Sequence, residues 1–198
     1  MFLGEQAHKR LDESNRLHPP AEVMAFDDME TAEHSKLKPL SITLAVEVRS
    51  RRILGLEVSR MPAKGHLARM SRKKYGVRKD ERARGRQKLF ARLSPLVAEN
   101  AIIKSDENPH YPDDVKRFFP HAQHLPEKGQ RGSVAGQGEL KRVRFDPLFH
   151  LNHTCAMLRA NVNRLFRKTW CLTKKPEKLA LHLAMYAVYH NLSLLKPP

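Results

Sequence analysis

Three apolar runs of strand length, joined by short polar links, most strongly limit what this chain can fold into. They cover residues 23–31, 40–48 and 53–58, and the second run is rich in β-branched residues. Such residues favour strands, and a short link between two such runs is typical of an antiparallel hairpin or meander. We therefore expect three consecutive antiparallel strands in the first third of the chain.

A strongly basic segment follows the third run. Between Arg60 and Arg92 the chain has 13 Lys or Arg and only two acids, Asp80 and Glu81. Its second half has apolar residues at helical spacing over residues 79–100, which predicts a helix with an apolar inner face and a basic outer face. Residues 101–106 then form a fourth strand-like run. A strand, helix and strand in this order predict a crossover in a mixed sheet.

The last part of the chain is predicted to be mainly helical. Residues 112–119 form a short helix, residues 121–125 add an edge strand, and residues 127–139, with four glycines, form a loop. Asp146 before Pro147 is a helix-start signal. An apolar seam follows at alternating spacings of three and four, consisting of Leu148, Leu151, Cys155, Leu158, Val162 and Leu165. A final helix begins near Pro176.

The charge balance indicates a polyanionic partner. The chain has 198 residues, a net charge of +16 and a pI near 10.2, and 40% of its residues are hydrophobic, enough to build a core. No stretch approaches the length of a transmembrane span, and the first ten residues are too polar for a signal peptide. Two cysteines indicate no disulfide framework. We expect a cytoplasmic protein that binds nucleic acid and no membrane.

Two aspartates lie in strand-like apolar runs. Asp27 is within residues 23–27 and Asp106 ends residues 101–106. A carboxylate in a buried strand is unfavourable unless a cation or hydrogen bonds stabilise it. In a chain this basic, the pair indicates Mg²⁺ (or Mn²⁺) held against a polyanionic substrate. The alternative is that both are turn or strand-end aspartates, and Asp28 or Glu30 takes the place of Asp27 if the strand register differs by one.

A third ligand is expected from the helix that carries the apolar seam. Asn152 lies at the edge of the seam, and Arg159 lies two turns further on the same flank. An amide oxygen there can coordinate a metal and a guanidinium can bind phosphate. The alternative for Asn152 is an amide bonded within the fold. The pairs His121/His124 and His150/His153 have zinc-ligand spacing, but zinc is the less favoured interpretation.

These residues carry a resemblance to a known family. The segment FDDMET at residues 26–31, the segment KSD at residues 104–106, a helix with Arg159 seven residues after its ligand position, and the basic segment NVNRLFRK at residues 161–168 occur in this order. The order resembles the catalytic core of bacterial insertion-sequence transposases of the DDE class. The likeness is to the small two-frame type, in which a zinc-ribbon and helix-turn-helix frame precedes the catalytic one, and it covers residues 26–191.

The resemblance implies an RNase H-like α/β fold, a mixed sheet with the C-terminal helices packed on it. It implies a DNA transposase that hydrolyses a phosphodiester and transfers the strand with Mg²⁺ (or Mn²⁺). Asp27 and Asp106 take the two acid positions and Asn152 takes the third, where the family usually has glutamate. A neutral ligand lowers the charge of the site, which is expected to weaken metal binding. Arg159 would contact a phosphate.

The resemblance also gives the expected organisation. Residues 1–20 are a polar helical stub or linker, residues 21–192 the catalytic domain and residues 193–198 a tail. Residues 1–25 contain no counterpart of the family's DNA-recognition modules, so we expect a separate N-terminal DNA-recognition protein. The other expected partners are double-stranded DNA at the transposon ends and target, and further copies of the chain on that DNA, in the bacterial cytosol at the nucleoid.

Basic residues along the duplex backbone complete the hypothesis. The expected contacts are Lys73, Lys74, Arg78, Arg82, Arg86, Lys128, Arg131, Lys141 and Arg142. The alternative is that the basic segment is a solvated face. Two alternative functions remain open at this point: a structure-directed nuclease on the same fold, which cuts without joining, and a non-catalytic nucleic-acid-binding remnant of a transposase.

Overall fold

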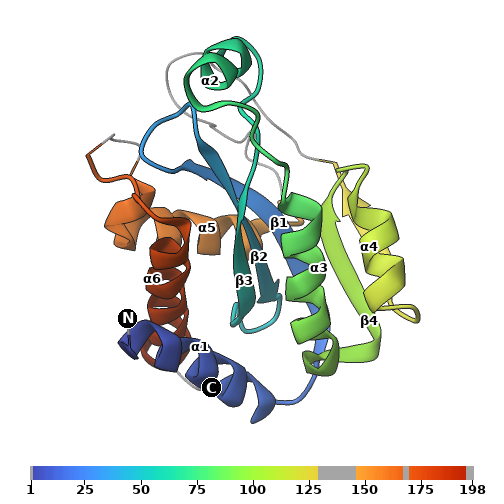
Figure 1. The fold of residues 1–198 in the computed structure, drawn as a ribbon. Helices are drawn as coiled ribbons and strands as arrows, with labels where there is room; N and C mark the ends of the chain where they lie inside the picture. Colours follow the sequence, from blue (N-terminus) through green and yellow to red (C-terminus); the bar gives the residue numbers. More distant parts are fainter. Residues whose placement is uncertain (1, 129–145, 167–169, 195–198) are drawn as a thin grey trace.

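A five-stranded mixed sheet forms the centre of the protein in the computed structural model, which describes residues 2–128, 146–166 and 170–194 (Figure 1). The strands are β1 (Ala21–Ala32), β2 (Pro39–Glu47), β3 (Ile53–Arg60), β4 (Val97–Asp106) and β5 (Gln123–Glu127). Their order across the sheet is β3-β2-β1-β4-β5. The three N-terminal strands pair antiparallel, whereas β4 pairs parallel to β1 and β5 parallel to β4.

Helices cover both faces of this sheet. They are α1 (Phe2–Arg16), α2 (Leu67–Tyr75), α3 (Arg82–Leu93), α4 (Tyr111–Phe118), α5 (Phe149–Asn161) and α6 (Pro176–Tyr189), with short helical turns at Ser94–Leu96, Asn163–Leu165 and His190–Leu194. One apolar core joins the sheet to α1, α5 and α6, and a second joins it to α3 and α4. The predicted fold class is confirmed: the strand order and the helices on both faces are those of an RNase H-like fold.

The central strand β1 contributes to both cores because its side chains alternate. Ala25 and Met29 belong to the core under α5 and α6, whereas Met24 and Phe26 belong to the core under α3 and α4. A strand buried on both faces is expected to read as a continuous apolar run, which explains why residues 23–26 show no polar alternation. Asp27 stands out because it interrupts that run.

Helix α5 buries the seam that the spacing predicts. Its side chains Leu151, Cys155 and Leu158 are buried, and Leu165 after the helix lies in the same core. The helix ends at Asn161, so the last seam positions follow it in a short turn rather than continue it. Among the described helices, none is both long and apolar enough to cross a lipid bilayer.

Two expectations about boundaries differ from the structure. The predicted long helix of residues 79–100 is shorter, because Pro95 sits in a 3₁₀ turn after α3 and β4 begins at Val97; proline restricts the preceding residue and has no N–H for the helix ladder. The N-terminal helix is also packed rather than a linker. Leu11 is only 1% exposed, and Asn15 donates hydrogen bonds to the carbonyl oxygens of Ile53 and Leu54.

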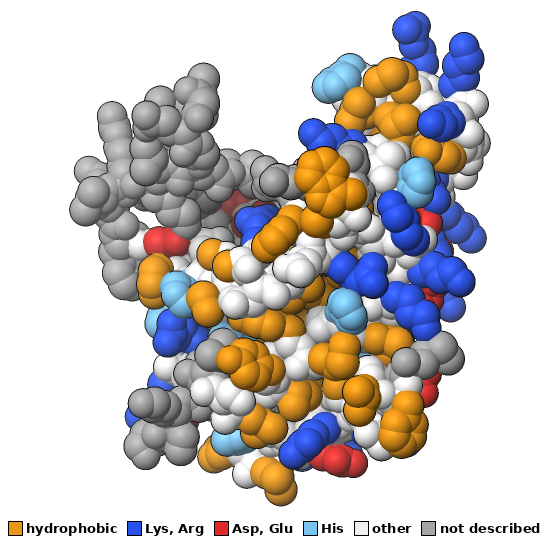
Figure 2. Space-filling model, turned by 90° about the vertical axis from the view of Figure 1, so that its left-hand side faces the viewer, with side chains coloured by type: hydrophobic (Ala, Val, Ile, Leu, Met, Phe, Trp, Pro, Cys, Tyr) orange, Lys and Arg blue, Asp and Glu red, His pale blue; other side chains and the backbone are white. Residues whose placement is uncertain are grey.

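Helix α2 projects from the body of the protein beyond one end of the sheet (Figure 1). It carries exposed basic residues at Arg69, Arg72, Lys73 and Lys74. Lys and Arg side chains gather on this projecting part in the space-filling view (Figure 2). The basic segment of the sequence is therefore divided between an outlying helix, α2, and a packed helix, α3.

Candidate active site

The strand register places Asp27 and Asp106 at the same level of neighbouring strands. The parallel ladder between β1 and β4 pairs Ala25 with Lys104, and both aspartates lie two residues further along their strands. Residues two apart in a strand share a face. Ala25 faces the core that contains α5, so both carboxylates are on the face that this helix covers.

The environment of Asp27 favours its protonated form. Burial, together with the negative charge of Asp106, raises the pKa of Asp27 to about 7, against the lowering effect of hydrogen bonds from the Asp28 backbone and Tyr111. Its Oδ1 accepts these bonds from the Asp28 N–H at 2.7 Å and the Tyr111 hydroxyl at 3.4 Å. A charge on one carboxylate therefore opposes ionisation of the other, as in closely spaced acids of active sites.

No cationic side chain of the described residues forms an ion pair with Asp27 or Asp106. Asp106 does accept a hydrogen bond from the backbone N–H of Asn108 at 3.1 Å, so the turn interpretation describes part of its role. A partly buried acid pair without a protein cation lacks the partner that such charges normally require. An external cation would supply it.

Helix α5 lies over this pair. Burial, together with the charge of the Asp27 carboxylate, raises the pKa of the Cys155 thiol to about 12, and Arg159 has an opposing effect. Both charges therefore lie close enough to act on Cys155. Arg159 is exposed, and its guanidinium forms no ion pair with a described residue.

Asn152 lies one turn before Cys155 and is half-buried. Its Nδ2 donates a 2.9 Å hydrogen bond to Oδ2 of Asp146, which precedes the helix, while its amide oxygen accepts none from a described residue. The Asp146 carboxylate therefore fixes the orientation of the Asn152 amide, with its nitrogen toward Asp146. The alternative of an amide bonded within the fold holds for the nitrogen, whereas the oxygen has no hydrogen-bond donor among the described residues.

The acidic neighbours of Asp27 have other partners. Asp28 accepts a hydrogen bond from the hydroxyl of Thr43 on β2, and Glu30 is exposed and forms an ion pair with Lys64 at 2.7 Å. Neither faces α5 as Asp27 does, because Asp28 and Glu30 have the opposite parity on β1. The expected register, with Asp27 toward the C-terminal helix, is the one that the structure has.

These donors suit a hard cation. Carboxylate and amide oxygens are the ligands that Mg²⁺ takes in proteins. Among the described residues there is no group of three or more His, Cys, Asp or Glu side chains that could hold a metal ion. A site here would therefore consist of two carboxylates and a neutral oxygen. The same finding gives no support to zinc at the two histidine pairs.

The expected DNA-contacting residues fall into three groups. Lys73, Lys74 and Lys128 are exposed and form no ion pair with a described residue, as a backbone contact requires. Arg131, Lys141 and Arg142 lie outside the described residues. The remaining three arginines have partners within the fold.

Arg86 is the clearest correction. It is 3% exposed, and its guanidinium pairs with Asp114 and lies over the ring of Tyr111 at 5.0 Å. The prediction that it contacts DNA is wrong, because a buried and paired guanidinium cannot reach a phosphate. Arg78 donates to the carbonyl oxygens of Met61 and Pro39, and Arg82 pairs with Asp80, so both primarily support local structure.

Two supporting residues were missed by reasoning from the sequence. Tyr111 is fully buried and reaches Asp27 from the start of α4, and Asp146, read only as a helix-start signal, also holds Asn152. For Tyr111 the sequence has no signal, since it is 84 residues from its partner. For Asp146 the six-residue separation from Asn152 was available as a hint.

No family model and no curated protein sequence matches the chain. Similar solved structures include the simian T-cell lymphotropic virus intasome in complex with PP2A regulatory subunit B56 gamma. The TM-score is 0.47, the sequence identity is 12%, and the match covers 91% of this chain. This chain spans about half (51%) of the matched chain of that structure.

Two catalytic domains are also similar. They are the HTLV-2 integrase catalytic core domain in complex with magnesium (TM-score 0.41, 12% identity, 90% of this chain and 91% of that chain) and the catalytic domain of Mos1 mariner transposase (TM-score 0.41, 12% identity, 96% and 86%).

Proposed function

We propose that this domain is a metal-dependent polynucleotidyl transferase acting on DNA, the catalytic domain of a DDE-class insertion-sequence transposase. One observation carries the proposal. Asp27 and Asp106 lie level on adjacent parallel strands, partly buried, and the charge of Asp106 raises the pKa of Asp27, while no described cationic side chain forms an ion pair with either. The resemblance in motif order supports the transposase assignment, with asparagine at the third position.

Each residue of the site has a distinct task. Asp27 and Asp106 would hold Mg²⁺ (or Mn²⁺), and the amide oxygen of Asn152 would complete the ligand set, with Asp146 orienting it. A metal bound there would stabilise the charge that develops on the phosphoryl oxygens. Arg159, exposed on the same helix, would bind a non-reacting phosphate oxygen and position the strand.

The substrate would be double-stranded DNA. Lys73 and Lys74 on α2, together with Lys128 after β5, are free to contact the backbone, and the net charge of +16 favours association with a polyanion. Assembly of several copies on transposon ends, with a separate DNA-recognition protein in the bacterial cytosol, belongs to the same proposal.

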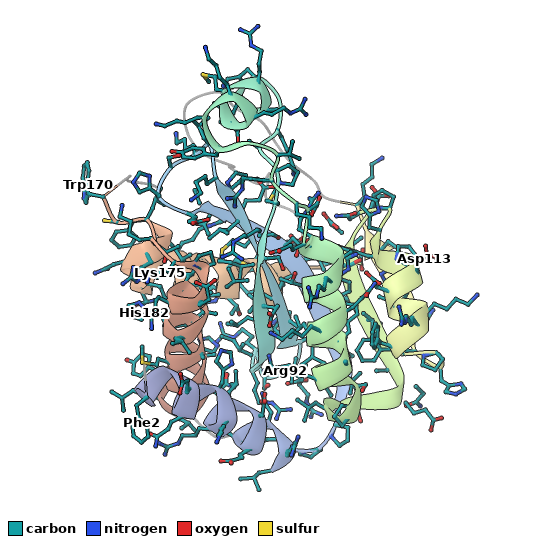
Figure 3. All side chains as sticks on the ribbon, viewed as in Figure 1. Phe2, Arg92, Asp113, Trp170, Lys175 and His182 are labelled. Atoms are coloured by element: carbon teal, nitrogen blue, oxygen red, sulfur yellow. The ribbon has the colours of Figure 1, made fainter. Side chains whose placement is uncertain are left out.

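The test is a plasmid assay with Mn²⁺ and an oligonucleotide carrying a free 3′-hydroxyl. The expected result is nicking of the plasmid and joining of the oligonucleotide, both lost by at least 100-fold in Asp27→Asn and Asp106→Asn. Asp113→Asn is the matched control, because Asp113 is exposed and points away from the body on α4 (Figure 3).

The outcomes separate the alternatives. Cleavage without a joined product would replace the transposase with a nuclease. Equal activity in the wild type and both site variants would overturn the proposal, because the reaction would then take place elsewhere. No metal-linked stabilisation and no reaction in any protein would leave a nucleic-acid-binding remnant.

A further inference from the structure

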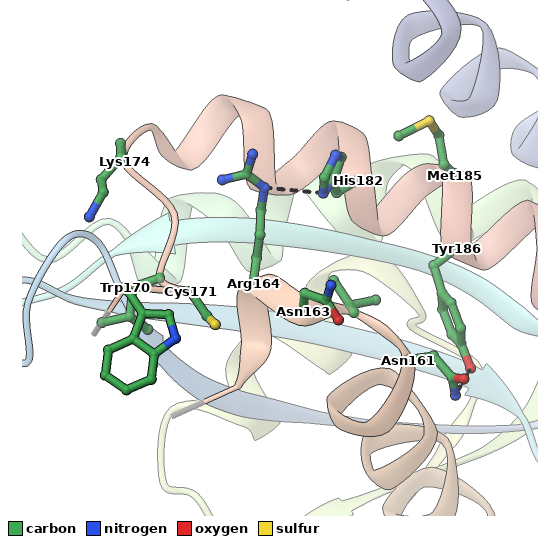
Figure 4. Close-up of a pocket in the computed structure, with 11 residues that line it drawn as sticks. Asn161, Asn163, Arg164, Trp170, Cys171, Lys174, His182, Met185 and Tyr186 are labelled. Carbon is green, nitrogen blue, oxygen red and sulfur yellow. Dashed lines mark hydrogen bonds between the residues drawn. The ribbon is translucent and has the colours of Figure 1, made fainter. Parts of the chain in front are cut away.

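A surface groove separate from the acid pair lies between the end of α5 and helix α6. Its volume is about 580 Å³, within the range of ligand sites, and residues on both sides of the loop that joins the two helices line it (Figure 4). Trp170 and Lys174 lie at one end, Asn161 and Tyr186 at the other, and Arg164 between them.

The chemistry of the lining is that of a nucleotide site. No Asp or Glu is among the described residues that line the groove, whereas Arg164 and Lys174 supply positive charge. Two amides line the groove. The Nδ2 of Asn161 donates to the Met157 carbonyl oxygen and the Tyr186 hydroxyl, so Asn161 offers its amide oxygen as an acceptor, whereas Asn163 offers an amide of the kind that binds base edges. The combination of cations, amides and an aromatic ring without acids matches phosphates linked to bases.

Trp170 is the most unusual member of this set. It is the only tryptophan in the chain, and it is 75% exposed. A large aromatic surface in water is unfavourable, and such rings are enriched where they contact a partner. Nucleic-acid bases stack on aromatic side chains whatever their sequence. The ring projects outward from the connection between the helices (Figure 3).

Arg164 is oriented for a phosphate. Its Nε donates a 3.1 Å hydrogen bond to Nδ1 of His182 on α6, which holds the side chain across the groove (Figure 4). Burial, followed by the charge of Arg164, lowers the pKa of His182, so the imidazole acts as an uncharged acceptor. The two terminal nitrogens of the guanidinium form no ion pair with a described carboxylate and are left for a ligand.

The groove is on the helix that covers the acid pair. Asn152 and Asn161 are nine residues apart on α5, which corresponds to about 14 Å at 1.5 Å per residue. Stacked nucleotides advance about 3.4 Å each, so about four of them span this length. A strand that passes the acid pair and runs along α5 would therefore arrive at the groove after a few nucleotides.

We propose that the groove of Asn161, Asn163, Arg164, Trp170, Lys174 and Tyr186 binds unpaired nucleotides of a single DNA strand, with a base stacked on Trp170 and phosphates on Arg164 and Lys174. The proposal rests on the proposed function for its choice of DNA. It adds that the protein selects a strand that has been separated from its complement near the reacting phosphodiester.

Because Trp170 is the only tryptophan, tryptophan fluorescence, excited selectively over that of the tyrosines, reports on this groove alone. Fluorescein-labelled oligo(dT)₁₂ is titrated in EDTA, and both tryptophan quenching and fluorescence anisotropy are followed. We expect saturable quenching and tighter binding of oligo(dT)₁₂ than of a 12-base-pair duplex. Trp170→Ala should weaken binding at least tenfold by anisotropy, and Trp170→Phe should restore most of it because the ring is retained.

The contribution of Arg164 is measured separately. Arg164→Ala should weaken binding about fivefold and reduce the magnitude of the slope of log K against log salt by about 0.7, the value for one phosphate contact on a single strand. Lys9→Ala, which removes an exposed charge from α1, and Phe2→Ala, which removes an exposed ring there, are the matched controls and should change binding less than twofold. Thermal unfolding checks that each variant is folded.

Two results would overturn the inference: absence of tryptophan quenching at saturating oligonucleotide, or oligo(dT)₁₂ affinities that do not differ between Trp170→Ala and Phe2→Ala. Since the measurement uses EDTA, it is independent of the acid pair. Strand binding without metal-dependent nicking would remove only the proposed function, and nicking without dependence on Trp170 would remove only this inference.

Discussion

Replacing Asp27 by asparagine is expected to stabilise the metal-free protein at neutral and alkaline pH. Unfolding releases Asp27 from the core and from the charge of Asp106, and its pKa returns from about 7 toward 3.8. Between these values the folded state binds more protons than the unfolded state, so the free energy of unfolding falls as pH rises through this window. Asparagine carries no charge and avoids that loss.

The size of the effect follows from the two pKa values. The gap in unfolding free energy between Asp27→Asn and the wild type should grow from about 2 kcal/mol at pH 5 to about 4 kcal/mol at pH 8. Asparagine retains Oδ1, which can still accept the hydrogen bonds from the Asp28 backbone and Tyr111. The change therefore removes the charge with little loss of contacts.

Urea unfolding at pH 5, 6, 7 and 8 in EDTA measures the gap, with Asp113→Asn as the control that loses an exposed carboxylate. The control should stay within about 0.5 kcal/mol of the wild type at every pH. Saturating Mg²⁺ should narrow or reverse the gap, since it stabilises the wild type by mass action. A variant that is less stable than the wild type at pH 8 in EDTA, or a gap that does not change with pH, would refute the reasoning.

Three further changes have definite expectations. Asn152→Asp adds a charge at the third ligand position and should tighten Mn²⁺ binding at least tenfold, measured by calorimetry; unchanged affinity would place residue 152 outside the site. Arg86→Met leaves the Asp114 carboxylate buried and unpaired, so it should lower the free energy of unfolding by about 3–5 kcal/mol. The folded variant should bind DNA as the wild type does. An effect on DNA affinity alone would contradict the buried ion pair. Arg159→Ala should reduce joining of the oligonucleotide about tenfold or more while the unfolding midpoint stays within about 2 °C, and an unchanged rate would argue against phosphate contact.

The sheet could be predicted from the sequence because a short stretch of consecutive residues is enough to identify each strand. Each of the first three strands reads as an apolar run with short links, and β1 is buried on both faces, so its composition alone identifies it. The apolar seam from Leu148 to Leu165 could also be predicted, because helical spacing identifies the side chains that face the core. That Asp27 and Asp106 stand level also requires β1 and β4 to be neighbours with Ala25 paired to Lys104, which the structure supplies.

Burial of charged residues could not be read in the same way. Arg86 stands in a run of basic residues, and only the position of Asp114, 28 residues later, decides that it is paired inside the protein. The N-terminal helix looked like a linker because its apolar surface is small, yet Leu11 is buried against α6 and the sheet. Long-range pairing determines both cases, and sequence spacing carries no signal for it.

Direct binding of Mn²⁺, followed by electron paramagnetic resonance with and without Mg²⁺ competition, tests the central claim that Asp27 and Asp106 form one cation site. The account predicts saturable binding to the wild type and to Asp113→Asn, displaced by Mg²⁺ and weakened at least tenfold in both Asp27→Asn and Asp106→Asn. Binding that is absent from the wild type, or that persists unchanged in the two variants, would contradict it.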